Sequence, residues 1–585
     1  MSSPPSSSDA SFTRLHPTIQ RWIYREGWRE LRDAQAAAIE AILPGGRDVL
    51  VAAPTAAGKT EAAFLPLLTR ILSSEKDGVR AIYIGPLKAL INDQFGRLEG
   101  LCEELDLPVH RWHGDVPASA KARLREKPSG ILLITPESLE ALFVRFGSSI
   151  PRIFAGVEAA VVDETHAFIG SERGAQLQSL LHRVEDALGR RVDRIGLSAT
   201  LGEPSIAAEF LRPGGGERVA LVESQSGSGQ LRALVVGVED SGGETNAPIA
   251  LHQVARHLYA RMRDSSNLVF ANSRNRVEAL ADLLVTECHE HNVPETFGAH
   301  HGSLSKELRQ DVEARLKEED RPFTAVCTST LEMGIDIGAM KAIGQVGVPP
   351  SVASLRQRVG RSGRRQGEIP TLWMYAIEQR IEPASHPFDR LRAGLFEACA
   401  MLELMSERWC EPPRDTALHL STLIQQCLSA VAERGGIEPL RLYRLLCGTG
   451  PFAKVDTATF VALLRRLHEK KLIVQSSDGT LLAGEVGERL VNHYSFYSAF
   501  ATPEEYRLVH YGRTLGTLPI DFPVHPEGYL IFGGRRWRVK EIDEEAKIIS
   551  VERAASGVAP AFGNDGPFGT HPEVRRRMRR LYERD

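Results

Sequence analysis

Short apolar runs alternate with longer amphipathic stretches through most of the chain. Strands that alternate with helices predict parallel sheets with helices on both faces. The expected strands of a first sheet are 48–52, 81–84, 131–134, 159–162 and 194–197. Those of a second sheet are 268–271, 324–327, 343–346 and 372–375. We therefore expect the fold class to be α/β, with two parallel-sheet domains.

The segments beside these runs predict helices and a junction. Residues 14–43 have a helical pattern that ends in Pro44-Gly45-Gly46. Residues 213–248 carry clusters of glycine and serine, which are typical of loops, and we expect a domain junction there.

The last part of the chain has a different pattern. Residues 417–434, 438–447 and 455–471 predict three short helices, and 472–481 predicts a hairpin around Asp478-Gly479. This is the order of a winged helix, a module that usually reads DNA with its third helix. Residues 529–540 then predict a strand pair, and 572–585 predict a very basic helix.

Composition narrows the class of protein. A chain of 585 residues is expected to form two to four domains. Because the net charge is −4, the chain has no overall basic field, and any surface that binds nucleic acid must be a local basic patch. Seven cysteines without a C-x-x-C pair argue against a zinc module and a disulfide framework, and indicate a reducing, cytoplasmic compartment. Residues 1–13 lack the features of a signal peptide and predict a disordered tail, and no apolar run is long enough to span a membrane.

The first chemical motif is Ala53-Pro54-Thr55-Ala56-Ala57-Gly58-Lys59-Thr60, between an expected strand and an expected helix. Small residues let backbone N–H groups surround phosphate oxygens, and the helix N-terminus adds positive charge. Lys59 would reach the β- and γ-phosphates, and the Thr60 hydroxyl would bind Mg²⁺. The alternative is an ordinary strand-to-helix turn of small residues.

The second motif is Asp163-Glu164, which follows an expected strand. Asp163 would hold Mg²⁺ through water, and Glu164 would orient and deprotonate an attacking water. Adjacent carboxylates at a strand end also serve as helix caps. Ser198 and Thr200 would bond His166, with a structural polar cluster as the alternative.

Gln35 lies just upstream of the phosphate loop, where its amide can read both edges of adenine; otherwise it is a solvated helix residue. The second sheet has no phosphate loop. It carries the segments 329–338 and 357–365. The guanidinium groups of Arg361 and Arg364, in the second segment, suit binding of the γ-phosphate of a nucleotide held by the other domain. A solvated basic helix and a nucleic-acid patch are the alternatives. Trp537, among arginines, either stacks on a base or lies in a core.

Together these motifs resemble superfamily 2 helicases with two RecA-like domains, over roughly residues 14–385. Gln35 resembles the Q motif of that family. The other motifs, from I through Ia, Ib, II, III, IV and V to VI, resemble Ala53–Thr60, Gly85–Leu90, Thr135–Glu137, Asp163–His166, Ser198–Thr200, Phe270–Arg274, Thr328–Gly338 and Gln357–Arg364.

Further details resemble the large helicase-related (Lhr) group: Gly27-Trp28, the run 86–90, the run 331–338 and the tail beyond residue 400. Ala56 and Ala57 depart from the commoner glycine and serine of motif I. The Asp-Glu-Thr-His form of motif II argues against a DEAD-box RNA helicase. A C-terminal cysteine cluster, present in a related group of repair helicases, is absent from the sequence.

The resemblance implies an ATP-driven 3′→5′ translocase on single-stranded DNA that unwinds RNA:DNA and DNA duplexes in DNA repair. It implies ATP and Mg²⁺ as cofactors, single-stranded DNA and RNA:DNA hybrid as partners, contacts with repair proteins, no membrane association and a monomer. In this group the winged helix resembles a brace for the nucleic-acid strand along which the enzyme moves. The alternatives are an ATP-dependent RNA helicase that remodels structured RNA, and a nucleic-acid scaffold with an inactive ATP site.

The implied site residues fall into three sets. Catalysis is expected from Lys59, Asp163, Glu164, Arg361 and Arg364, and the magnesium site from Thr60 and Asp163. Nucleotide contacts are expected from Gln35, Thr55, Ala57, Gly58, Lys59, Thr60, Asp163, Glu164, Gly334, Asp336, Arg361 and Arg364. Nucleic-acid contacts are expected from Pro86, Lys88, Thr135, Pro136, Ser273, Arg274, Thr328, Ser329, Thr330 and Trp537.

The implied domains follow the disordered tail. They are a first RecA-like domain that binds ATP, a second RecA-like domain, a winged helix, and a β-rich domain that the sequence leaves open as whole or incomplete. Their expected bounds are 14–215, 216–390, 391–490 and 491–585.

Overall fold

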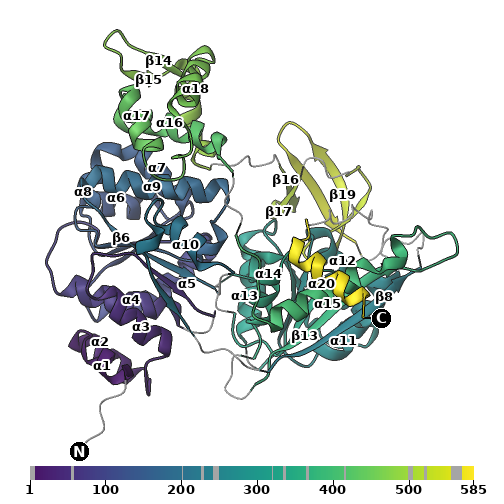
Figure 1. The fold of residues 1–585 in the computed structure, drawn as a ribbon. Helices are drawn as coiled ribbons and strands as arrows, with labels where there is room; N and C mark the ends of the chain where they lie inside the picture. The colour runs from purple at the N-terminus through teal and green to yellow at the C-terminus, as the bar shows by residue number, and fades with distance from the viewer. Residues whose placement is uncertain are drawn as a thin grey trace, which may run out of the picture. The chain divides into compact units, whose positions relative to one another are not determined.

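The computed structural model describes residues 7–54, 58–199, 202–224, 230–241, 249–318, 320–333, 337–363, 368–413, 417–498, 505–519, 524–554 and 569–584. The chain divides into two compact units (Figure 1). The first combines Met1–Gly227 with Pro412–Thr502, and the second combines Ser228–Glu411 with Pro503–Asp585. No helix in the described ranges has the length and apolar character needed to cross a membrane.

The first unit contains a parallel sheet with the strand order β3-β4-β2-β5-β6-β1-β7. Its strands are β1 Val49–Ala52, β2 Ala81–Ile84, β3 Val109–Trp112, β4 Ile131–Ile134, β5 Ala159–Val162, β6 Asp193–Ser198 and β7 Ala220–Glu223. Its helices are α1 Ser7–Thr13, α2 Pro17–Arg25, α3 Asp33–Ile42, α4 Lys59–Leu72, α5 Lys88–Glu103, α6 Ala118–Glu126, α7 Pro136–Phe146, α8 Ile150–Ile153, α9 Glu172–Leu188 and α10 Pro204–Leu211.

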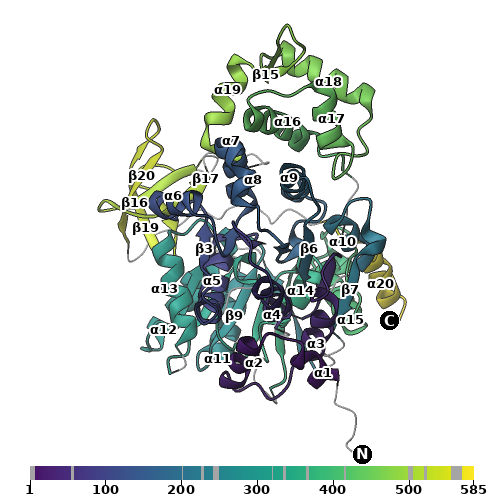
Figure 2. The same ribbon diagram turned by 90° about the vertical axis from the view of Figure 1, so that its left-hand side faces the viewer.

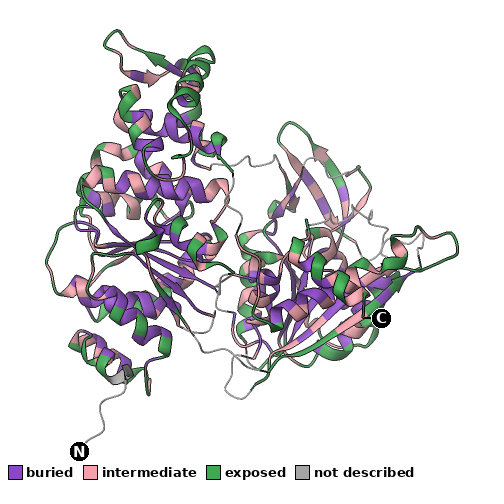
Figure 3. Cartoon of the chain, in the orientation of Figure 1, coloured by how far each residue is buried: buried purple, intermediate pink, exposed green. Residues whose placement is uncertain are grey.

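The interior strands of this sheet are buried on both faces, as Figure 3 shows. Successive side chains of a strand point to opposite faces, so each strand contributes to two cores. Val49 and Val51 belong to the same core cluster as Phe64 of α4, whereas Leu50 belongs to the cluster that contains Phe143 of α7. Near-continuous apolar runs of this kind are typical of parallel strands covered by helices on both sides.

The winged helix packs on the first unit's helices. It consists of α16 Leu420–Arg434, α17 Pro439–Cys447, α18 Thr457–Glu469, β14 Ile473–Gln475, β15 Leu481–Ala483 and α19 Glu485–Asn492. The two views in Figures 1 and 2 place α16 beside α7 and α9, and residue contacts join these helices. The predicted three helices and hairpin are therefore present and belong to the same compact unit as the first sheet.

A buried charge network joins α16 to this unit. The Arg183 side chain on α9 is fully buried and pairs with Glu140 at 3.1 Å and with Glu433 at 2.6 Å. Its guanidinium also donates to Gln426 and Ser429, each at 3.0 Å. Burial lowers the pKa of Arg183, but the charges of Glu433 and Glu140 outweigh this effect and raise it. The network therefore holds the winged helix through an arginine that stays charged.

We expect Arg183→Met to destabilise the first unit by about 3 kcal/mol or more, because it leaves two buried carboxylates without their cation. Urea denaturation measures the effect. The control is Arg465→Met on α18, where the exposed side chain should contribute less than about 0.5 kcal/mol. Equal denaturation midpoints for the two variants would contradict the importance of the network.

The second unit contains a parallel sheet with the strand order β10-β11-β9-β12-β13-β8. Its strands are β8 Arg232–Asp240, β9 Asn267–Ala271, β10 Phe297–His300, β11 Thr324–Cys327, β12 Ile343–Val346 and β13 Thr371–Gln379. Its helices are α11 Ile249–Met262, α12 Arg274–Glu290, α13 Lys306–Lys317, α14 Val352–Val359, α15 Ala393–Ser406 and α20 Pro572–Tyr582. The expected α/β class with two parallel-sheet domains is confirmed.

A five-stranded sheet completes the second unit, in the order β17-β16-β20-β19-β18. Its strands are β16 Glu505–His510, β17 Arg513–Pro519, β18 Tyr529–Ile531, β19 Arg536–Asp543 and β20 Ile548–Arg553. Gly533 and Gly534 both have φ of +66°, and their N–H groups donate to Glu278 of α12 at 2.7 and 2.6 Å. Glu278 also bonds His301 at 2.6 Å, so a buried carboxylate fixes this sheet to the RecA-like part.

Three predictions about local structure were wrong. Residues 7–13 form α1 instead of a disordered tail, because Phe12 packs on the first core and Ser11 bonds Glu40. Residues 213–248 contain the edge strands β7 and β8, so the junction is not all loop. The predicted helical stretch 14–43 is interrupted, since Gly27 with φ of +72° separates α2 from α3.

The compact units also differ from the predicted domain bounds. Residues 391–411 include α15, which packs on β13 and α20 and belongs to the second unit. Its buried side chains Ala398, Met401 and Leu404 explain this placement. Tyr497 belongs with the first unit, where its hydroxyl accepts a hydrogen bond from Arg145 at 2.8 Å.

Candidate functional site

The phosphate loop and the acidic motif of the first unit lie at the same edge of its sheet. Strand β6 pairs with both β1 and β5, so the carboxyl ends of these three strands are neighbours. Ligands of open parallel sheets bind at this edge. Lys59 follows β1, Asp163 follows β5, and Ser198 ends β6. The topology therefore brings together motifs that are more than a hundred residues apart in the sequence.

Gly58 closes the loop in a backbone conformation that other residues rarely adopt. Its φ is +71°, and a Cβ there would lie 2.5 Å from Nε2 of Gln35. Gly58 precedes α4, whose first residue is Lys59. Thr55, Ala56 and Ala57 lie outside the described residues, so their predicted contacts with phosphate stay predictions.

Lys59 is placed for an anion. Its side chain is buried, with 7 % of its surface exposed, and Nζ makes no hydrogen bond to any described group. A buried ammonium without a partner is costly, and an anion at the N-terminus of α4 would remove that cost. Lys59 also lies close enough to Asp163 to lower the pKa of that carboxyl. These residues fit a magnesium–nucleotide complex.

Asp163 and Glu164 are both buried at the end of β5. Oδ1 of Asp163 accepts the Glu164 N–H at 2.8 Å, and Oδ2 accepts the hydroxyl of Tyr83. Burial and the charge of Glu164 raise the pKa of Asp163 to about 6, although Tyr83 and Lys59 oppose this rise. Glu164 has a φ of +48°, a strained conformation of the kind found at functional sites.

The described residues contain no group of three or more His, Cys, Asp or Glu side chains arranged to hold a metal ion. Magnesium usually binds through one or two carboxylates together with water and substrate phosphates. Asp163, with the hydroxyl of Thr60 on α4, offers a donor set of this kind.

Tyr83 was missed by the sequence analysis, which treated its strand as uniformly apolar. A buried tyrosine hydroxyl usually has a hydrogen-bond partner, and this rule could have indicated a polar group beside β2. Strand β2 pairs with β5, and Tyr83 lies opposite Val161. The Tyr83 hydroxyl therefore orients the carboxylate expected to hold Mg²⁺.

We expect Tyr83→Phe to raise the Mg²⁺ concentration needed for half-maximal ATP hydrolysis by about tenfold, a typical cost of losing a bond to a metal ligand. A Mg²⁺ titration of fluorescent ADP binding should shift in parallel. The control is Tyr259→Phe, which removes the same hydroxyl from a buried tyrosine of the second unit. Unchanged Mg²⁺ dependence in Tyr83→Phe would remove this role.

The predicted contact between motifs II and III is present. Nδ1 of His166 lies 3.1 Å from Oγ of Ser198 and 3.5 Å from Oε2 of Glu164. The histidine thus links the acidic residue to the end of β6. Thr200, the other predicted partner, lies outside the described residues.

Gln35 is a buried residue of α3 and not a solvated one. Its Oε1 accepts the N–H of Arg32 at 3.0 Å in a capping box, and its Nε2 faces Gly58. Gln35 thus supports the phosphate loop, and its contact with adenine stays a prediction.

The four residues of the first unit that are expected to contact nucleic acid differ in their exposure to solvent. Lys88 is exposed and pairs with Asp115 at 2.9 Å, whereas Pro86 and Pro136 are buried. The Thr135 hydroxyl caps α7 by accepting the N–H of Ser138 at 3.3 Å. Among these four, Lys88 offers the side chain with access to a phosphate.

The second unit places motifs IV, V and VI together in its core. Arg358 donates to the carboxylate of Glu332 at 2.9 and 3.0 Å, and its guanidinium lies 4.9 Å from the ring centroid of Phe270. Arg361, with 1 % of its surface exposed, donates to the carbonyl of Glu332 at 3.2 and 2.7 Å. Gly334, Asp336 and Arg364 lie outside the described residues, so their roles stay predictions.

The residues of the second RecA-like sheet that are expected to contact nucleic acid follow the carboxyl ends of β9 and β11. Ser273 caps α12, and Arg274 is exposed and pairs with Glu505 at 3.5 Å. Thr328 and Ser329 follow β11 at the surface. Thr330 bonds Nδ1 of His300 at 2.9 Å. These positions leave hydroxyl groups and one guanidinium near a common edge.

Trp537 occupies the core of the five-stranded sheet. Its side chain is buried, and its indole N–H donates to the carbonyl of Phe532 at 2.8 Å. This is the core position that the sequence left open as the alternative to base stacking.

Two histidine motifs at sheet edges were also missed. His113-Gly114 follows β3, the edge strand of the first sheet, and His301-Gly302 follows β10, the edge strand of the second. His113 lies 3.1 Å from Asn92, and His301 lies 2.6 Å from Glu278. In each sheet, therefore, a His-Gly pair stands between the edge strand and the next helix, and these pairs are visible in the sequence at 113–114 and 301–302.

Comparison with known families gives two matches. Residues 32–208 match the DEAD/DEAH box helicase family, and residues 250–366 match the helicase conserved C-terminal domain. These ranges contain β1 to β6 of the first sheet and β9 to β12 of the second.

Relatives and solved structures agree with these matches. The chain is 30% identical over 582 residues to the Lhr helicase/probable uracil glycosylase of Mycolicibacterium smegmatis, covering 88% of this chain and 37% of the relative. It is 34% identical over 373 residues to the ATP-dependent helicase Lhr-Core of Methanothermobacter thermautotrophicus, covering 60% and 42%. The chain thus spans less than half of these relatives.

The structure of Mycobacterium smegmatis helicase Lhr bound to ssDNA and AMP-PNP superposes with a TM-score of 0.71 at 30% identity, covering 85% of this chain and 63% of that one. The DUF1998 helicase MrfA bound to DNA and AMPPNP superposes with a TM-score of 0.74 at 21% identity, covering 95% and 73%. At that identity, the second likeness concerns the fold alone.

Proposed function

Because the chain belongs to the large helicase-related (Lhr) group of superfamily 2 helicases, we propose that it is an ATP-driven translocase. It would move 3′→5′ on single-stranded DNA and unwind RNA:DNA and DNA duplexes. The observation that carries the proposal is the buried Lys59 ammonium, which has no described partner and lies near Asp163. The related Lhr structure bound to ssDNA and AMP-PNP supports the same ligands here.

Hydrolysis depends on groups held at one sheet edge. Lys59 would bind the β- and γ-phosphates, and Asp163 with Thr60 would hold Mg²⁺. Bound Mg²⁺ bridges phosphate oxygens and neutralises developing charge. Glu164 would position the attacking water and accept its proton. Gln35 would keep Gly58 in place, since its amide faces that residue.

The second unit would supply Arg361 and Arg364 to the transferring phosphoryl group. An arginine fork stabilises the charge that spreads over the phosphoryl oxygens in the transition state. Arg361 donates to the Glu332 carbonyl in motif V, which also contains residues expected to contact nucleic acid. Hydrolysis of the nucleotide would therefore be coupled to the contacts with nucleic acid.

Lys88 and Arg274 are the exposed cations among the residues expected to contact nucleic acid, and they would bind its backbone phosphates. The winged helix, joined to the first unit by Arg183, would brace the strand instead of reading its sequence. We further propose that the protein acts as a monomer with DNA-repair proteins in the cytoplasm. The seven unpaired cysteines favour such a reducing compartment.

Two alternatives remain testable. An RNA helicase that remodels structured RNA would be stimulated more by RNA than by DNA single strands. An inactive scaffold would bind a fluorescent ATP analogue without turnover even with saturating strand. The described Lys59, Asp163 and Glu164 favour an active enzyme over the scaffold.

We expect ATP hydrolysis to depend on single-stranded nucleic acid, because a strand that binds both units would favour the arrangement that completes the site. Steady-state ATPase assays with and without a single-stranded DNA oligonucleotide measure this dependence, and Glu164→Gln is the background control. Equal rates with and without a saturating strand would contradict the proposed coupling.

A further inference from the structure

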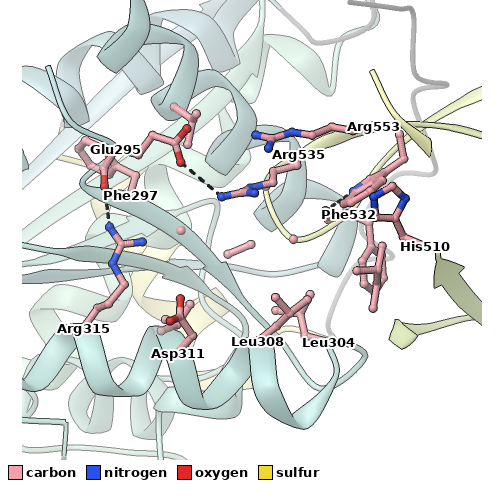
Figure 4. Close-up of a pocket in the computed structure, with 18 of the residues that line it drawn as sticks. Glu295, Phe297, Leu304, Leu308, Asp311, Arg315, His510, Phe532, Arg535 and Arg553 are labelled. Carbon is pink, nitrogen blue, oxygen red and sulfur yellow. Dashed lines mark hydrogen bonds and ion pairs between the residues drawn. The ribbon is translucent and has the colours of Figure 1, made fainter. Parts of the chain in front are cut away.

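A pocket in the second unit lies where α12, β10 and α13 meet the five-stranded sheet (Figure 4). Its volume is about 290 Å³. The floor is apolar and is formed by Val285, Phe297, Leu304, Leu308, Phe532 and Trp537. The pocket contains none of the residues expected to bind the nucleotide, so it is a separate feature of the chain.

Cationic side chains surround this apolar floor. They are Arg315, Arg513, Arg535 and Arg553, and the imidazole of His510 lies among them. Arg535 is half-exposed and pairs loosely with Glu295, at 3.6 Å (Figure 4). The side chains of Arg513 and Arg553 are exposed and make no hydrogen bond or ion pair with another described side chain or backbone group. The rim therefore has cationic groups available for an acidic ligand.

Arg315 and His510 are held by contacts within the protein. Arg315 donates to the carbonyl of Glu295 at 2.6 Å, and its guanidinium lies 3.9 Å from the ring centroid of Phe323. Nδ1 of His510 bonds the carbonyl of Val551 at 2.9 Å. These contacts hold one part of the rim in place, while Arg513 and Arg553 remain able to adjust to a ligand.

We propose that this pocket binds an acidic peptide segment of a partner protein, with one aromatic or large aliphatic side chain in the cavity. A volume of about 290 Å³ is at the lower limit for sites of drug-sized molecules, but it accommodates one anchor side chain. Protein interfaces commonly bury such an anchor in a pocket and place charged pairs around it. Acidic residues beside the anchor would meet Arg513 and Arg553.

The carboxylates of the pocket favour a peptide over a nucleic-acid strand. Asp311 and Glu295 line the cavity along with the arginines. A DNA backbone offers Asp311 only oxygen atoms that cannot donate, whereas a peptide backbone offers N–H groups that can donate to Asp311 between its acidic side chains. The mixed rim therefore matches a chain that has both donors and acidic side chains.

The test uses a fluorescein-labelled peptide with a run of aspartates followed by a single phenylalanine, and fluorescence anisotropy with the full chain. A second peptide replaces the phenylalanine with serine. We expect the serine peptide to bind about tenfold more weakly, because its side chain leaves the cavity empty. We expect Arg553→Glu to weaken binding of the phenylalanine peptide by about tenfold, through repulsion at the rim.

The matched control is Arg575→Glu, which makes the same charge change on an exposed arginine of α20. It should leave peptide affinity unchanged, and both variants should keep the wild-type ATPase rate. Val285→Trp, which fills the cavity, should also abolish binding while retaining a cooperative thermal transition.

Three results would overturn the proposal. The first is equal affinity for the two peptides, and the second is equal weakening by Arg553→Glu and Arg575→Glu. The third is loss of single-stranded DNA affinity in Arg553→Glu together with displacement of the peptide by that DNA. The third result would assign the pocket to the path of a nucleic-acid strand instead of a partner protein.

Discussion

Glu164→Gln should lower ATP turnover by at least about a hundredfold while preserving nucleotide binding, because the amide cannot accept the proton of the attacking water. Gln has nearly the same shape as Glu and should keep the strained backbone at φ +48°. A tight complex of ATP and single-stranded DNA should accumulate in this variant. Single-turnover hydrolysis and fluorescent-nucleotide titration measure the two effects separately.

Lys59→Ala is the matched comparison. It removes a cation expected to contact phosphate both in the bound state and in the transition state, so affinity and turnover should fall together. No trapped ATP–DNA complex should form. Near-normal turnover in Glu164→Gln would show that another group positions the water.

Arg361→Ala and Arg364→Ala should each reduce turnover by roughly 10³-fold while most of the affinity for a tailed strand is retained. The physical reason is that an arginine supplied from a second domain stabilises charge present only in the transition state. Because Arg361 also bonds the Glu332 carbonyl, thermal melting should accompany the kinetic assays.

Arg274→Ala supplies the opposite control. This exposed arginine is expected to bind a backbone phosphate, so its loss should weaken strand binding and make the salt dependence shallower. Turnover at saturating strand should persist. If Arg361→Ala and Arg364→Ala instead show reduced salt slopes with intact turnover, these arginines contact the strand and not the phosphoryl group.

The sequence predicted the interior of both sheets well. Apolar runs such as 131–134 and 324–327 became β4 and β11 with the predicted bounds, because a strand buried on both faces has little room for polar residues. The winged helix also followed from its helices and its Asp-Gly turn. In each case the signal was local and strong.

Other features depended on tertiary context that the sequence does not express. Strand β8 has largely exposed or partly exposed side chains at the edge of its sheet, so it shows little apolar periodicity. Helix α1 is stabilised by contacts of Phe12 and Ser11 with distant residues. Local propensity alone cannot reveal either element.

The candidate site likewise combines residues that the sequence revealed with contacts that it did not reveal. Lys59, Asp163 and Glu164 were recognised from motifs, and the strand order places them at one edge. The hydroxyl of Tyr83 on Asp163 joins neighbouring strands, and the pairing of Arg358 with Glu332 joins a helix to a loop. Such bonds become visible when the fold brings separate segments together.

The proposed 3′→5′ translocation is tested most directly by unwinding of matched duplexes that carry either a 3′ or a 5′ single-stranded DNA tail. Each tailed strand is paired with a labelled DNA or RNA strand, and release is measured with ATP and Mg²⁺ against Glu164→Gln. We expect wild-type protein to release both labelled strands from the 3′-tailed duplexes and neither from the 5′-tailed ones. Preferential release from 5′-tailed duplexes, or equal release by wild type and Glu164→Gln, would contradict an ATP-driven 3′→5′ translocase.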